Sequence, residues 1–146
     1  MEYSFIKLEV IDSVAVVEMD RKKELNALSL EMMGELYHVF GRLIPKRDDI
    51  RVVVLTGGEH SFSAGMDLRQ AIVSNGEDIT DYCEKAVGVF NKILDLDRIL
   101  LTAISGICMG GGFNLALMGD IIIASESAIF SHPEIKYGFN PVLTPL

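Results

Sequence analysis

The sequence predicts an α/β protein with a mostly parallel sheet. First, apolar runs of strand length alternate along the chain with segments of helical periodicity. Second, the later runs are almost continuously apolar, which is typical of strands buried on both faces of a parallel sheet. Third, two glycine-containing loops each stand between such a run and a helix start. The repeated order of a strand, a loop and a helix indicates the α/β class.

The chain begins with two strand-like runs, residues 5–11 and 14–19, separated by Asp12-Ser13, which predicts a hairpin or a tight strand pair. Ser29 is a candidate N-cap for an amphipathic helix that continues until Pro45. The remaining elements are predicted as strand, helix, strand, helix, strand and strand, at residues 51–56, 82–94, 100–104, 113–118, 120–124 and 128–131.

No linker or low-complexity segment divides the sequence, so we expect a single domain over residues 1–146. Residues 138–146 combine turn residues with apolar side chains and offer no closing helix. This pattern indicates a piece of a longer protein.

Composition excludes several classes of function. With 49% hydrophobic and 23% charged residues, the chain is typical of a folded domain. Its net charge of −8 gives no general attraction to nucleic acid or to an anionic membrane. The apolar runs are too short to span a bilayer and no signal peptide is recognisable, so we expect a soluble, cytoplasmic protein. Cys83 and Cys108 lie far apart without metal-ligand spacing, so neither a disulfide nor a metal site is predicted.

The two glycine-containing loops, residues 57–67 and 105–112, would each aim backbone N–H groups at the same side of the sheet. The second contains Gly110-Gly111-Gly112, which matches neither the P-loop nor the dinucleotide-binding pattern. A phosphate cradle is therefore the weaker interpretation. Two N–H groups that converge on a carbonyl oxygen would instead form an oxyanion hole, which needs glycine for access.

Four motifs, in order, resemble the enoyl-CoA hydratase/isomerase family, the crotonases. They are Ser-Phe-Ser-Ala-Gly-Met-Asp-Leu (61–68), Ser-Gly-Ile-Cys-Met-Gly-Gly-Gly (105–112), Asp-Ile-Ile-Ile-Ala (120–124) and Pro-Glu-Ile (133–135). Leu-Asn-Ala-Leu (25–28) resembles an early signature of the same family. The resemblance implies a crotonase-like spiral of ββα units with mostly parallel sheets. It also implies a coenzyme A thioester as substrate, no cofactor, and a homotrimer or hexamer if the family's C-terminal helical region is present. This chain is expected to lack that region.

The resemblance also implies roles for individual residues. Met66 and Gly111 would supply the two backbone N–H groups of the oxyanion hole, and Ala64 would present its carbonyl to the adenine. The residues implied to bind substrate are Ala64, Met66, Asp67, Leu68, Gly110 and Gly111.

The proton-handling groups depart from the family pattern. Hydratases of this family carry two glutamates, but here Asn114 stands at the first position and only Glu134 remains. Hydration usually needs two carboxylates, whereas moving a double bond needs one base that lifts a proton and returns it nearby. The sequence therefore leans to isomerisation over hydration, with Glu134 as acid/base, while Asn114 could orient a water. His132 could assist if it faces the same side.

Other interpretations stay open at this point. Glu134 is also compatible with a surface turn after Pro133, and Asn114 with a simple hydrogen bonder at a helix start. The protein could be a non-catalytic acyl-CoA binder, because the second glutamate is missing. It could also be a fragment of a dinucleotide-binding oxidoreductase, although the spaced glycines of that class are absent.

Overall fold

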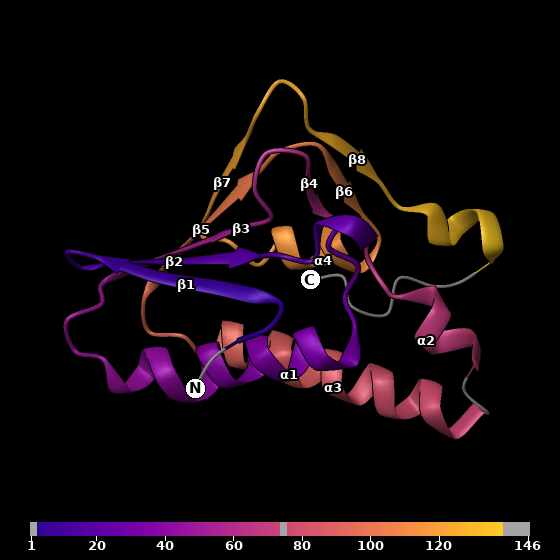
Figure 1. Cartoon of the computed structure of the whole chain (residues 1–146), viewed down its shortest axis with the longest axis horizontal. Helices are drawn as coiled ribbons and strands as arrows, with labels where there is room; N and C mark the ends of the chain where they lie inside the picture. Colours follow the sequence, from indigo (N-terminus) through magenta and orange to yellow (C-terminus); the bar gives the residue numbers. More distant parts are fainter. Residues whose placement is uncertain (1–2, 74–75, 139–146) are drawn as a thin grey trace.

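The computed structural model describes residues 3–73 and 76–138 and contains two sheets. The larger sheet has five strands in the order β1-β2-β3-β5-β7, and the smaller has three in the order β4-β6-β8. Figure 1 shows the two sheets meeting at an angle, with the helices below and between them. The strands are β1 (Ile6–Ile11), β2 (Val14–Met19), β3 (Val52–Thr56), β4 (Ser61–Ser63), β5 (Ile99–Ile104), β6 (Ile107–Met109), β7 (Ile121–Ala124) and β8 (Ile129–Ser131).

All described strand pairs are parallel except the β1–β2 hairpin. The chain passes three times from the large sheet to the small one, from β3 to β4, from β5 to β6 and from β7 to β8. Helices separate the successive passes. This repetition confirms the predicted α/β class and the predicted repeat of ββα units.

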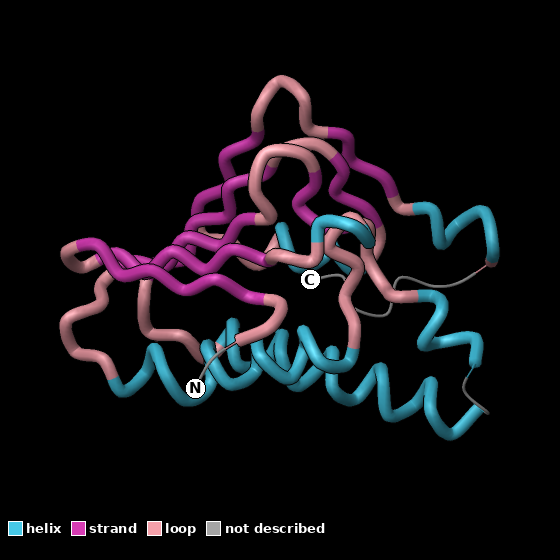
Figure 2. Tube along the Cα trace, viewed as in Figure 1, coloured by secondary structure: helices cyan, strands magenta, loops and turns pink. Residues whose placement is uncertain are grey.

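The helices are α1 (Leu30–His38), α2 (Leu68–Val73), α3 (Gly76–Leu94) and α4 (Gly111–Ala116). Helices α1 and α3 pack against each other on one side of the large sheet, as Figure 2 shows in cyan beneath the magenta strands. Alternate strand residues face this layer, among them Val17, Val53 and Leu55, which are fully buried. Helix α4 instead contacts β4 and β6 of the small sheet, so it lies where the two sheets meet.

Helix α1 begins as predicted, because the Ser29 hydroxyl accepts a hydrogen bond from Met32 N at 3.2 Å. Its regular α-helical part ends at His38, earlier than predicted. The chain continues through a π turn, Val39–Leu43, and a 3₁₀ turn that contains Pro45. Proline has no N–H to continue the helical hydrogen bonds, so the helical segment stops there.

Strands β4 and β6 were not predicted, because their residues were interpreted as loop. Each is only three residues long, and its pairing partners come from distant parts of the chain. Gly106 makes the turn into β6 with a φ of +61°, and a Cβ at this position would overlap the carbonyl of His60. No periodicity can reveal strands this short.

Strand β7 forms one edge of the large sheet, and its four residues, Ile121–Ala124, are all exposed. Its apolar run is typical of a buried strand, but no other described element covers it. Among the described residues, no helix combines the length and the apolar character that a membrane span requires. The predicted irregular end, residues 139–146, lies outside the described residues.

Candidate active site

The turn before α1 is held by Asn26, which is 1% exposed and has a φ of +54°. Its side-chain amide donates to Gly57 O at 2.9 Å and to Ser61 O at 2.8 Å. Its side-chain oxygen accepts from Arg21 N at 2.8 Å. The Ser63 hydroxyl in turn donates to Asn26 O at 2.8 Å. The motif at residues 25–28 therefore fastens this turn to the loop that carries the first glycine motif.

Asn26→Ala should lower the free energy of unfolding by at least about 2 kcal/mol, because each buried polar group left unsatisfied costs about 1–3 kcal/mol. The substitution removes the hydrogen bonds to Gly57 O, Ser61 O and Arg21 N together. Urea denaturation of the variant measures this loss. Asn91→Ala, at an exposed position of α3, is the matched control and should change stability little. Equal stabilities for the two variants would contradict the assigned role.

Met66 pairs with Leu28 in an isolated parallel β-bridge. Leu28 N donates to Gly65 O at 2.8 Å, and Asp67 N donates to Leu28 O at 3.3 Å. In a parallel bridge these flanking groups make the hydrogen bonds, so the N–H of Met66 itself points away from Leu28. Gly65 has a φ of +91°, which a side chain rarely adopts. The Met66 N–H therefore makes neither of the two hydrogen bonds of this bridge.

The start of α4 lies beside Met66. A Cβ placed on Gly111 would lie 3.7 Å from Met66 N, and one placed on Gly65 would lie 3.1 Å from Gly111 N. Within the described part of the chain, neither the Met66 N–H nor the Gly111 N–H donates a hydrogen bond. The structure thus brings together the two amides that the sequence motifs singled out, although they are far apart in the chain.

The other two glycines of the triplet have packing roles. Gly110 adopts a φ of +50°, and its N–H donates to Ser131 O at 3.0 Å. A Cβ on Gly112 would lie 2.6 Å from Ser63 O, so a glycine is needed where α4 rests on β4. Helix α4 begins at Gly111, two residues before the predicted start at Phe113, and its N-cap, Gly110, has no side chain to make a capping hydrogen bond.

Glu134 lies in the 3₁₀ turn Pro133–Tyr137, next to the glycine triplet. A Cβ on Gly110 would be 2.5 Å from its Oε1, so the carboxylate packs directly over this glycine. Its Oε2 lies 3.5 Å from Nδ1 of His132. Asn114, which is 3% exposed, has its N–H bonded to Gly110 O at 3.0 Å. Its buried Oδ1 has no hydrogen-bond partner among the described residues. Glu134 therefore packs over Gly110, and Asn114 lies one helical turn after this glycine.

Asp67, Leu68 and Ala64 belong to the predicted substrate-binding segment. Both carboxylate oxygens of Asp67 already have partners, because Oδ2 pairs with Arg21 Nη1 at 2.6 Å and Oδ1 accepts from Arg69 N at 3.1 Å. Leu68 is 59% exposed, and Ala64 is half-buried, with its N–H bonded to Leu25 O at 2.9 Å. The roles of these residues in binding substrate stay predictions.

Two buried titratable side chains, those of Tyr82 and Cys108, have raised pKa values. The Tyr82 hydroxyl of α3 donates to Leu28 O, and burial raises the pKa of Tyr82 well above its usual value. Burial also raises the pKa of the Cys108 thiol to about 12, which makes it a core residue rather than a nucleophile. The sequence places Tyr82 only on the apolar stripe of a helix, and nothing in the sequence signals its bond to Leu28.

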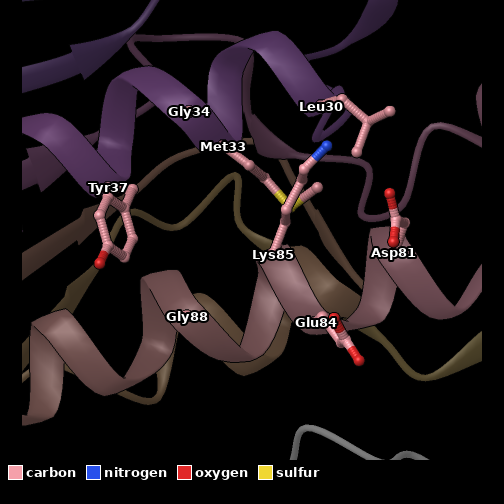
Figure 3. A pocket seen from close by; sticks show the side chains of 8 residues that line it. All are labelled: Leu30, Met33, Gly34, Tyr37, Asp81, Glu84, Lys85 and Gly88. Atoms are coloured by element: carbon pink, nitrogen blue, oxygen red, sulfur yellow. The ribbon is translucent and has the colours of Figure 1, made fainter.

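A groove lies between α1 and α3, and none of these residues lines it (Figure 3). It has a volume of about 570 Å³, and Gly34 and Gly88 leave space on its two sides. Lys85, Asp81 and Glu84 line it, and all of its lining residues come from the two helices. None of the predicted site residues lines this groove. Among the described residues, no group of three or more His, Cys, Asp or Glu side chains could hold a metal ion.

Known proteins resemble this chain in sequence and in fold. A family model described as enoyl-CoA hydratase/isomerase matches residues 9–145. The chain is 35% identical over 142 residues to a short-chain-enoyl-CoA hydratase of Clostridium acetobutylicum, covering 97% of this chain and 54% of the relative. It is 38% identical over 128 residues to a carnitinyl-CoA dehydratase of Citrobacter koseri, covering 86% of this chain and 47% of that protein.

The crystal structure of an enoyl-CoA hydratase from Bacillus anthracis matches with a TM-score of 0.90 and 31% identity, covering 94% of this chain and 54% of that chain. The chain thus spans about half the length of the curated relatives it matches. These matches do not favour the alternative of a dinucleotide-binding oxidoreductase.

Proposed function

The chain belongs to the enoyl-CoA hydratase/isomerase family, and from that premise we propose that it transfers protons on an acyl-CoA thioester through an enolate. One observation carries the proposal. The amides of Met66 and Gly111 lie in adjoining turns without hydrogen-bond partners among the described residues, and the carboxylate of Glu134 packs over the neighbouring Gly110. Two donors and one base around the same small space are what enolate formation requires.

In this reaction the Glu134 carboxylate takes a proton from the carbon next to the thioester. The electron pair of the broken C–H bond moves onto the thioester oxygen, which becomes an enolate. The N–H groups of Met66 and Gly111 hold this oxygen, and each donor of such a kind is worth about 3–4 kcal/mol in the transition state. The substrate of this step is a 3-enoyl-CoA. The enolate oxygen re-forms the thioester carbonyl, the double bond moves from the β,γ to the α,β position, and the electron pair of the old double bond takes the proton of Glu134 at the γ carbon.

Isomerisation is our first candidate because, among the described residues, Glu134 is the one glutamate at the two positions where hydratases of the family carry glutamates. Asn114 occupies the position of the second, and an amide cannot take up or deliver the second proton that hydration uses. Hydration is the second candidate. It is favoured by two relatives, which are a hydratase and a dehydratase, and by the buried Oδ1 of Asn114. This oxygen has no hydrogen-bond partner among the described residues and could accept one from water. A homotrimer or hexamer and a cytoplasmic location stay predictions.

Incubation of the protein with 2-enoyl-CoA and 3-enoyl-CoA esters in deuterated water tests this proposal. We expect deuterium at the α and γ carbons with migration of the double bond and no hydroxyacyl product, as read by mass spectrometry and NMR. Formation of 3-hydroxyacyl-CoA would favour the second candidate over the first. Tight binding of the esters without deuterium incorporation would overturn both and indicate a non-catalytic acyl-CoA binder.

A further inference from the structure

A histidine–carboxylate pair lies at the edge of the candidate site. His132 Nδ1 and Glu134 Oε2 are 3.5 Å apart, and the segment Pro133–Tyr137 begins between them. Both atoms are buried, and neither makes a hydrogen bond to any described residue. Buried polar atoms normally have a partner. Within the part of the chain that the structure describes, each of these two atoms therefore has the other as its available partner.

The imidazole of His132 is held in place by α4. Its ring centroid lies 4.8 Å from that of Phe113, with the ring planes tilted by 41°. Phe113 also contacts Phe130 of β8, at 5.2 Å between centroids. The side chain of His132 is 30% exposed, so most of its surface lies against the protein. The helix that carries Gly111 and Asn114 thus also fixes the position of this histidine.

The opposite side of the Glu134 carboxylate rests on Gly110, since a Cβ there would come within 2.5 Å of Oε1. The hydrogen bond from Gly110 N to Ser131 O, 3.0 Å long, fastens the segment before Glu134 to the same glycine. One carboxylate oxygen therefore faces His132. The other faces the glycine triplet, next to the amide of Gly111.

No other described group competes for this carboxylate from the surrounding elements. Strands β4, β6 and β8 and helix α4 contain no Asp, Glu, Lys, Arg or His. Their one ionisable side chain is Cys108, and burial raises the pKa of its thiol to about 12, so it stays neutral near pH 7. Lys136, in the same 3₁₀ turn as Glu134, is exposed. Among the described residues of these elements, His132 is thus the hydrogen-bonding side chain placed to act on Glu134.

We propose that His132 is a positioning residue for Glu134, and this inference rests on the proposed function. With a proton on Nδ1, the imidazole donates to Oε2 and leaves Oε1 to take the substrate proton. Hydrogen bonds of catalytic groups are often long before substrate binds and shorten in the complex, which agrees with the 3.5 Å separation. The pair gives the single base a fixed orientation that Asn114 does not supply.

Two substitutions at this position test the proposal in the deuterium-exchange reaction. His132→Leu fills the space beside Phe113 but cannot donate, and it should lower kcat about 10–100-fold, as misplacement of a reacting group does. KM should stay within about twofold. His132→Asn places an amide where Nδ1 stands and should recover most of the loss. His60→Leu, at an exposed histidine in the loop before β4, is the matched control and should retain full activity.

A second measurement does not depend on turnover. The protein has three histidines, so their ¹⁵N signals can be assigned by single substitutions. The Nδ1 signal of His132 should move in Glu134→Gln and stay unchanged in Glu126→Gln, which alters an exposed carboxylate. Full kcat in His132→Leu, a loss confined to KM, or an unmoved Nδ1 signal would overturn the inference. A moved signal in a protein that catalyses no exchange would instead overturn the proposed function and leave the pair as a structural contact.

Discussion

Replacing Gly111 by alanine should lower kcat on an enoyl-CoA thioester by about 10²–10³-fold, because a thioester oxygen kept out of the oxyanion hole loses as much as when a donor is removed. The added methyl group would lie 3.7 Å from Met66 N and so would occupy the space proposed for the thioester oxygen. Its other close neighbours, Leu28 Cδ1 at 3.6 Å and Gly65 Cα at 4.0 Å, are at ordinary contact distances. The melting temperature should therefore stay near that of the original protein while turnover is lost.

Two other glycines provide controls for this substitution. A Cβ on Gly34, in the middle of α1, would meet no atom within 4 Å, so Gly34→Ala should retain both activity and stability. Gly112→Ala would place a methyl group 2.6 Å from Ser63 O and should lower both stability and activity. Steady-state kinetics and thermal melting of the three variants separate these outcomes. Unchanged kcat in folded Gly111→Ala would rule out the proposed position of the oxyanion.

Glu134→Gln should lower kcat by about 10²–10⁴-fold, the usual contribution of general acid–base catalysis. Glutamine has nearly the same shape, so the side chain can still pack over Gly110 and lie beside His132. Binding of the ester, measured by calorimetry, should change little, because only the ability to take up a proton is removed. Deuterium exchange at the α and γ carbons should fall together with turnover.

The exposed carboxylate of Glu126, in the turn between β7 and β8, provides the matched control, and Glu126→Gln should keep full exchange. Exchange that persists at the original rate in Glu134→Gln would show that another group is the base. If His132→Leu then abolished that exchange, the imidazole rather than the carboxylate would be the proton acceptor.

Most of the large sheet could be predicted from the sequence, because its strands are long apolar runs. The predicted strand at residues 51–56 corresponds to β3 (Val52–Thr56), and the one at 100–104 to β5 (Ile99–Ile104). Strands β4 and β6 could not be predicted, since each has three residues and is stabilised by pairing with distant segments. For the same reason periodicity gives no sign of a second sheet, which only the resemblance to the family implied.

The predicted site residues came from motifs, and the structure adds the contacts that hold them. The ion pair of Arg21 with Asp67 joins two segments that lie 46 residues apart in the sequence. The buried amide of Asn26 and the hydroxyl of Tyr82 likewise support Leu28 and the loop beside it. Such contacts depend on where the chain passes in space, so periodicity and motif spacing cannot reveal them.

The sequence alone determined the strands of the large sheet, the helices α1, α3 and α4, the family, and the choice of Met66, Gly111, Asn114 and Glu134 as candidates, because local pattern and motif order carry that information. Only the tertiary structure decided that the amides of Met66 and Gly111 lie side by side and that His132 faces Glu134. The physical reason is that parallel pairing of the short strands β4, β6 and β8 sets these distances, and such pairing depends on the fold of the whole chain.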